Sequence, residues 1–77
     1  MHYARLRNLR EDGDMTQKQL AAKLHCSQRV YSNYERGDVD IPTEVLISLA
    51  FIYDTSIDYI LELTDVEVPY ARRARRA

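Results

Sequence analysis

The sequence predicts an all-α domain of five short helices, and three observations support this fold class. Apolar residues recur at intervals of three and four in five separate segments, which is the pattern of an amphipathic helix. A serine, threonine or proline precedes four of these segments at the position where helices begin. The 77 residues include two glycines, two prolines and few alternating apolar and polar runs, which argues against a β-sheet.

The first helix is expected from about residue 2 to residue 12. Its apolar stripe consists of Tyr3, Leu6 and Leu9. The sequence Asp12-Gly13-Asp14 follows and is typical of a chain that leaves a helix. We therefore expect this helix to serve as scaffold.

The second helix is expected to begin after Thr16. Thr16 is a favourable N-cap, and Gln19 three residues later completes a capping box. The apolar face of this helix consists of Leu20, Ala21 and Leu24.

The third helix is expected at residues 28–36. Ser27 is its N-cap, and His25 and Cys26 alone separate it from the second helix, so the chain has to change direction sharply. Gly37 ends the helix as a left-handed cap. Two capped helices joined this tightly indicate a helix-turn-helix, whose second helix enters the major groove of DNA.

The outer face of the third helix carries the candidate DNA-reading side chains. Tyr31 and Tyr34 are three residues apart and are expected in the core, although a tyrosine hydroxyl at the rim of such a face can also reach a phosphate. The side chains left to face solvent are Gln28, Arg29, Ser32 and Asn33. Glutamine can pair with adenine N6 and N7, and arginine with guanine O6 and N7, so these residue types suit base reading. Plain solvent exposure is the alternative interpretation.

The last two helices are expected to complete the core. Proline suits the first turn of a helix, and Pro42 precedes an apolar run of Val45, Leu46, Leu49, Ala50 and Tyr53. Asp54-Thr55 ends that helix. Ser56 then caps a short helix whose apolar residues are Ile57, Ile60 and Leu61.

The domain is expected at residues 1–65, with a basic tail at residues 66–77. A chain of 77 residues builds only a small core, so tight helix packing or a partner chain is expected to help. The tail contains Pro69 and the arginines Arg72, Arg73, Arg75 and Arg76 without an apolar stripe. It is therefore either disordered or a short docked helix, and a solubilising terminus is an equal alternative to a functional one.

The net charge of −1 conceals a strong segregation of charge along the chain. Residues 1–36 carry seven Lys or Arg and four acids, residues 37–71 carry eight acids and no Lys or Arg, and residues 72–77 carry four arginines. The basic part coincides with the helix-turn-helix, which favours a nucleic-acid partner. A chance distribution of solvated charges is the plainer interpretation.

Composition excludes several other classes of protein. No apolar stretch has transmembrane length and the N-terminus lacks the apolar block of a signal peptide, so we expect a cytoplasmic protein without a membrane partner. The single cysteine, Cys26, forms no intramolecular disulfide and is interpreted as a buried hydrophobe rather than a reactive thiol. His2 and His25 give no metal-ligand set, so neither a metal nor a cofactor is expected. The sequence contains neither a glycine-rich phosphate loop nor a nucleophile constellation, so we expect no enzyme.

Five motifs resemble the Cro/C1-type, or XRE-type, helix-turn-helix family of phage and bacterial repressors, over roughly residues 3–65. The motifs are Met15-Thr16-Gln17, Leu20-Ala21, Ser27-Gln28, Tyr34-Glu35-Arg36-Gly37 and Ser56-Ile57-Asp58-Tyr59-Ile60-Leu61. The resemblance implies a compact five-helix lambda-repressor-like domain that contains the helix-turn-helix in its second and third helices. It also implies a sequence-specific DNA-binding transcriptional regulator, in particular a repressor.

The resemblance also assigns roles to individual residues. It implies base contacts from Gln28, Arg29, Ser32 and Asn33, and a phosphate contact from Gln17 at the start of the second helix. Arg10 and Glu35 match positions that form a partly buried ion pair in such repressors, and Arg10 is a further candidate for a phosphate. His25 stands where the family often has a left-handed glycine, a conformation that histidine tolerates at some cost.

The chain departs from the family in the loop after the third helix. Asp38 and Asp40 are acidic where relatives often place basic residues against the DNA backbone. The expected compensation comes from Arg36, from Arg5 or Arg7, or from the arginine tail, because each neutralised phosphate adds to a salt-sensitive affinity.

The sequence further favours a homodimer on a pseudo-palindromic operator, since a domain of this size contacts only a half-site. The expected dimer interface is an apolar surface after Ser56, with the candidates Ile57, Tyr59 and Ile60. The alternative function is an antitoxin or protein-interaction module that binds a partner protein through the acidic second half and the tail.

Overall fold

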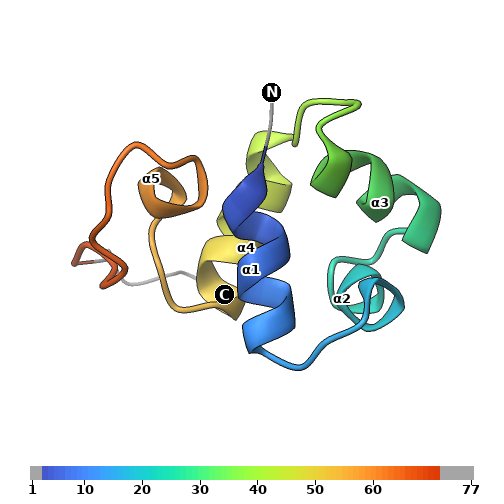
Figure 1. The fold of residues 1–77 in the computed structure, drawn as a ribbon, viewed down its shortest axis with the longest axis horizontal. Helices are drawn as coiled ribbons and strands as arrows, with labels where there is room; N and C mark the ends of the chain where they lie inside the picture. The colour runs from blue at the N-terminus through green and yellow to red at the C-terminus, as the bar shows by residue number, and fades with distance from the viewer. Residues whose placement is uncertain (1–2, 72–77) are drawn as a thin grey trace.

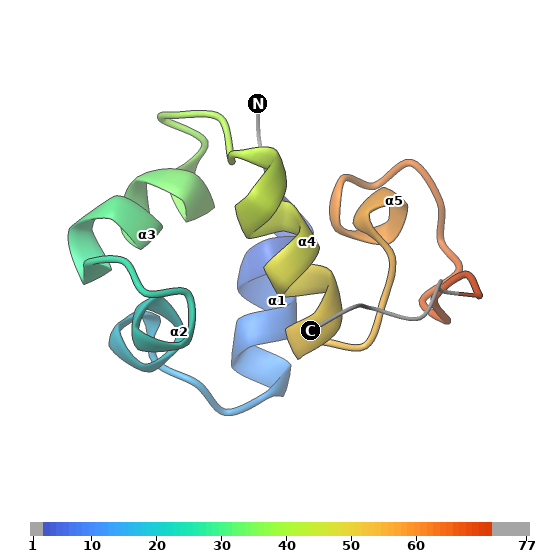
Figure 2. The same cartoon turned by 180° about the vertical axis from the view of Figure 1, so that it is seen from behind.

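The fold is all-α, as the sequence predicts. The computed structural model describes residues 3–71, which form five helices and no strand (Figure 1). The helices are α1 (Ala4–Asp12), α2 (Gln17–Lys23), α3 (Gln28–Arg36), α4 (Thr43–Ile52) and α5 (Ile57–Ile60). Helices α1 and α4 occupy the middle of the molecule, with α2 and α3 on one side and α5 on the other (Figures 1 and 2). The helix-turn-helix and the C-terminal segment therefore lie at opposite ends of the molecule.

The core draws one fully buried side chain from each helix. These side chains, at 0 % exposure, are Leu6, Leu20, Tyr31, Leu49 and Ile60. Ile60 was expected on an exposed dimer interface, and that expectation is wrong. The spacing of Ile57, Ile60 and Leu61 does define an apolar face, but this face packs into the protein's own core.

Side-chain caps begin three of the helices, as the sequence predicts. The Thr16 hydroxyl accepts a hydrogen bond from the Gln19 amide at 3.1 Å, and the Gln19 side chain accepts one from the Thr16 amide at 2.9 Å. The hydroxyls of Ser27 and Ser56 each accept a hydrogen bond from a backbone amide three residues later. These bonds satisfy amides that the first turn leaves unpaired, so they fix where α2, α3 and α5 begin.

Left-handed backbone shapes both ends of α3. His25, in the turn before α3, has a φ of 58°, and Gly37, at the end of α3, has a φ of 78°. Both predictions are confirmed. The sharp turn sets α2 against α3, and Gly37 turns the chain away from the exposed end of α3.

The chain after α5 is irregular and folds back onto the domain. The Thr55 hydroxyl donates to the Glu67 carbonyl at 2.5 Å, and the Tyr70 hydroxyl donates to the Asp58 carboxylate at 3.0 Å. Residues 66–71, the described part of the expected tail, therefore contact the α4–α5 end. The four tail arginines lie outside the described residues.

Arg5 ties α1 to the chain around α5. Its guanidinium lies 4.1 Å from the centroid of the Tyr59 ring and donates to the Tyr59 carbonyl at 2.9 Å. It also donates to the Thr64 carbonyl and, at 2.5 Å, to the Asp65 carboxylate. This arrangement joins residues almost sixty positions apart in the sequence.

Candidate nucleic-acid interface

Six polar side chains form one open surface depression over α3 and the start of α2. They are Gln17, Gln28, Arg29, Ser32, Asn33 and Arg36. The five α3 members are spaced by one, three, one and three residues, so they share a single face of the helix. The structure thus brings together the four candidate base readers and two of the candidate phosphate contacts, and we call this depression the α3 surface.

The opposite face of α3 is fixed in the core, which determines what the α3 surface presents. Tyr31 is fully buried, Glu35 is 8 % exposed, and Tyr34 is partly buried against the core. Both tyrosines therefore face inward, as predicted. Burial raises the pKa of the Tyr31 hydroxyl above its usual value, so this side chain stays neutral.

Three members of the α3 surface are unengaged. Within the described chain, the side chains of Gln28, Arg29 and Ser32 make neither a hydrogen bond nor an ion pair. Gln28 and Arg29 are exposed, and Ser32 is half-buried. Their donors and acceptors are therefore available to an external partner without breaking a contact.

The other three members are held by neighbouring residues. The Gln17 amide donates to the Glu35 carboxylate at 3.4 Å. The Arg36 guanidinium donates through Nη2 to Asn33 Oδ1 at 2.6 Å and through Nε to Asp38 Oδ2 at 3.0 Å. Sequence reasoning placed Asp38 in an acidic loop but missed its bond to Arg36. Arg36 and Asp38 are two residues apart with the left-handed Gly37 between them, and this spacing is the signal that could have revealed the bond.

The expected ion pair between Arg10 and Glu35 is present. Arg10 Nε and Nη2 each donate to a carboxylate oxygen of Glu35 at 2.9 Å, and the side chains are 14 % and 6 % exposed. Burial acts to raise the pKa of Glu35, but the hydrogen bonds and positive charge of Arg10, together with the other donors around the carboxylate, outweigh burial, so the pKa lies below its usual value. The same hydrogen bond raises the pKa of Arg10. This pair fixes α3 against α1.

Arg10 is poorly placed for a phosphate contact. Its Nη1 donates to the Met15 carbonyl at 3.0 Å, so all three guanidinium nitrogens are engaged. A phosphate would have to break a buried pair to reach it, which is costly. Arg10 is therefore a structural residue, engaged by Glu35 and Met15.

The other two candidate cations, Arg5 and Arg7, are also engaged by residues of the protein itself. Arg5 is turned toward α5 and is engaged with Tyr59 and Asp65. Arg7 is exposed on α1 and donates to Glu11 at 2.7 Å. Neither side chain lines the α3 surface.

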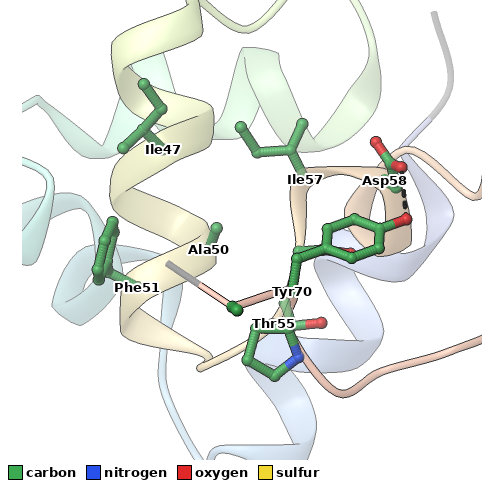
Figure 3. A pocket seen from close by; sticks show the side chains of 10 residues that line it. Ile47, Ala50, Phe51, Thr55, Ile57, Asp58 and Tyr70 are labelled. Atoms are coloured by element: carbon green, nitrogen blue, oxygen red, sulfur yellow. Dashed lines mark hydrogen bonds between the residues drawn. The ribbon is translucent and has the colours of Figure 1, made fainter. Parts of the chain in front are cut away.

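One of the three dimer candidates, Ile57, lines a second, apolar depression between α4 and α5. Ile57 is half-buried and lines this depression with Ile47, Phe51 and Tyr70 (Figure 3). Figure 3 also shows the Tyr70 hydroxyl directed at Asp58. Tyr59 is half-buried beneath Arg5. Ile57 and Tyr59 thus remain at least partly accessible, in contrast to Ile60.

Residues 3–71 give little support to a metal site, a reactive cysteine or a membrane-spanning helix. No group of three or more His, Cys, Asp or Glu side chains there could hold a metal ion. Cys26 is half-buried and burial raises the pKa of its thiol, which favours the protonated, unreactive form. The longest described helix, α4, has 10 residues, and none of the described helices could cross a bilayer.

Comparison with known proteins identifies the family. Residues 6–60 match a family model described as helix-turn-helix. The chain is 41 % identical over 73 residues to YobD of Bacillus subtilis (strain 168), an uncharacterized HTH-type transcriptional regulator. The matched region covers 95 % of this chain and 65 % of YobD. It is 39 % identical over 62 residues to the HTH-type transcriptional regulator ImmR of the same organism, covering 80 % of this chain and 49 % of ImmR.

The fold and the α3 surface define a helix-turn-helix domain. The chain belongs to the helix-turn-helix family of the Cro/C1 type, which confirms the predicted family and the lambda-repressor-like fold. It spans about half to two thirds of the length of these curated relatives. No solved structure matches the chain.

Proposed function

We propose that this protein is a sequence-specific DNA-binding transcriptional regulator, in particular a repressor, that acts in the cytoplasm without a catalytic step or a cofactor. The relatives YobD and ImmR are both named as HTH-type transcriptional regulators, which supports this function. The observation that carries the proposal is the α3 surface itself. The helix there exposes unengaged polar side chains, with the cation Arg36 at its C-terminal end, and this arrangement suits the reading of base edges.

In the proposed complex, α3 lies in the major groove. Gln28 and Arg29 are at the N-terminal end of α3, where recognition helices contact bases, and they are unengaged. Ser32 and Asn33 extend the same face by one turn. The proposed contacts are adenine N6 and N7 for Gln28 and guanine O6 and N7 for Arg29.

Two residues at the edge of the α3 surface are the proposed phosphate contacts. Gln17 is the first residue of α2, where free backbone amides and the positive end of the helix dipole favour an anion. Arg36 is exposed at the C-terminal end of α3. Gln17 contacts Glu35, the residue before Arg36, so both proposed phosphate contacts lie beside the C-terminal half of α3.

Selection of bound duplexes from a random pool tests sequence-specific binding. The expected result is one enriched sequence that binds at least 100-fold more tightly than a scrambled duplex at the same salt concentration. The logarithm of its affinity should fall linearly with the logarithm of salt concentration. Recovery of no enriched sequence would contradict the proposal. Capture of a stoichiometric protein partner in place of DNA would favour the alternative of an antitoxin or interaction module.

We also propose that two copies bind a pseudo-palindromic operator as a homodimer. The supporting observation is the apolar depression between α4 and α5, where Phe51 is 39 % and Tyr70 is 66 % exposed beside Ile57. Residues of α4 and α5 both line this depression, and α5 lies across α1 and α4 from α3 (Figure 2). Analytical ultracentrifugation with and without operator DNA should detect the dimer, and replacement of Phe51 by Ser should abolish it. A monomer under both conditions at high micromolar concentration would refute the dimer.

A further inference from the structure

A carboxylate occupies one of the two proposed phosphate contacts. Gly37 turns the chain at the end of α3, and the Asp38 amide donates to the Asn33 carbonyl at 3.0 Å. This places the Asp38 carboxylate beside Arg36, whose Nε donates to it at 3.0 Å. The backbone of the helix end thus holds an anion against a cation of the α3 surface.

The contact is accessible and can be exchanged. The side chains of Arg36 and Asp38 are 60 % and 57 % exposed, so neither is enclosed by the fold. A guanidinium binds a carboxylate and a phosphate oxygen in the same way, through directed N–H donors. Arg36 also donates to Asn33 Oδ1 at 2.6 Å, and this second bond holds the guanidinium over α3 when the carboxylate leaves.

We propose that Asp38 is an internal competitor for the DNA phosphate that Arg36 binds, and that it thereby sets the affinity of the protein for DNA. This inference rests on the proposed function of α3. The phosphate displaces the carboxylate on binding, and the displacement reduces the net gain from the Arg36 contact. Because Arg36 carries no base information, Asp38 lowers affinity for specific and non-specific duplexes alike.

The size of the effect follows from the exposure of the pair. Exposed ion pairs are weak, and a pair of this kind changes a binding constant by about two- to five-fold. Any acid near DNA also repels it, so removal of the negative charge increases affinity even without a specific bond. Asp40 is the matched control because it is an exposed aspartate in the same loop.

The test is a binding cycle on one selected duplex and one scrambled duplex. Asp38→Asn should tighten binding to both about two- to five-fold more than Asp40→Asn does. In the Arg36→Gln background, the gain in DNA affinity from Asp38→Asn should fall to the gain that Asp40→Asn gives. Thermal unfolding followed by circular dichroism establishes that each variant is folded.

Two results would overturn the inference and leave the proposed function standing. Equal gains in DNA affinity from Asp38→Asn and Asp40→Asn would show that Asp38 acts only by repelling DNA. A gain from Asp38→Asn that persists undiminished in Arg36→Gln would show that Arg36 is not the group that Asp38 occupies. In both cases the wild type still binds the selected duplex, so the proposed function stands. Failure of the wild type and of every variant to bind either duplex would overturn both.

Discussion

Arg10 and Glu35 join the first and third helices through two hydrogen bonds of 2.9 Å each. Glu35 Oε1 also accepts the 3.4 Å hydrogen bond from Gln17, at the start of α2. One buried carboxylate therefore links α1, α2 and α3. Its position on the inner face of α3 fixes how the α3 surface is presented.

Replacing Glu35 by Gln should lower the free energy of unfolding by about 3 kcal/mol, because the Arg10 charge would remain buried without its partner. Urea denaturation at pH 7 measures the change. Arg10→Met in the same chain should restore part of the loss by removing that charge. Arg36→Gln, which removes an exposed cation, should change stability by less than about 0.5 kcal/mol. A Glu35→Gln protein as stable as the wild type would show that the pair does not fix the fold.

Stability should fall in acid because of Glu35. Its pKa in the folded state lies below the usual value of 4.5, so its contribution to stability is fully present above about pH 4.5 and is lost as the pH falls through the folded pKa. Urea midpoints measured between pH 7 and pH 3 should decline more steeply for the wild type than for Glu35→Gln. Parallel curves for the two proteins would exclude Glu35 as a source of the acid sensitivity.

Gly37 should resist replacement. Its φ of 78° is strained for a residue with a Cβ, so Gly37→Ala should cost about 1–2 kcal/mol. Gly13 is the control, since its φ is −85° and an added Cβ would meet its nearest atoms at 3.4 Å. Thermal unfolding measures the stability of both variants, and Gly13→Ala should be as stable as the wild type. Equal losses at the two positions would contradict a left-handed end of α3.

Arg5→Gln should reduce stability without reducing DNA affinity. The change removes the contact with the Tyr59 ring and hydrogen bonds to two carbonyls, at a cost of about 2 kcal/mol. Because Arg5 does not line the α3 surface, the dissociation constant of the folded variant should match that of the wild type. An affinity loss as large as that of Arg36→Gln would place Arg5 at the DNA.

Local chemistry explains which parts of this fold could be predicted from the sequence. The caps at Thr16, Ser27 and Ser56 and the left-handed Gly37 depend on neighbours within three or four residues. The outer face of α3 was predictable because a nine-residue helix repeats its apolar spacing often enough to define its orientation.

The features that the sequence did not reveal depend on how the chain is arranged in three dimensions. Arg5 meets partners 54 to 60 residues later, which no local pattern encodes. Ile60 lies on a helix of four residues, and one turn does not say whether its apolar face meets the core or a second chain. The bond between Arg36 and Asp38 depends on how Gly37 turns the backbone, and the charge pattern alone does not specify it.

The central claim is that α3 reads base pairs, and the specificity of Arg29→Ala tests it most directly. Dissociation constants are measured for the wild type and the variant on the selected operator and on duplexes with single base-pair changes. Arg29→Ala should lose about 1–3 kcal/mol on the operator and lose its discrimination at one base pair, whereas Arg36→Gln should weaken binding to all duplexes equally. An equal loss by Arg29→Ala on the operator and on every altered duplex would contradict base reading by α3.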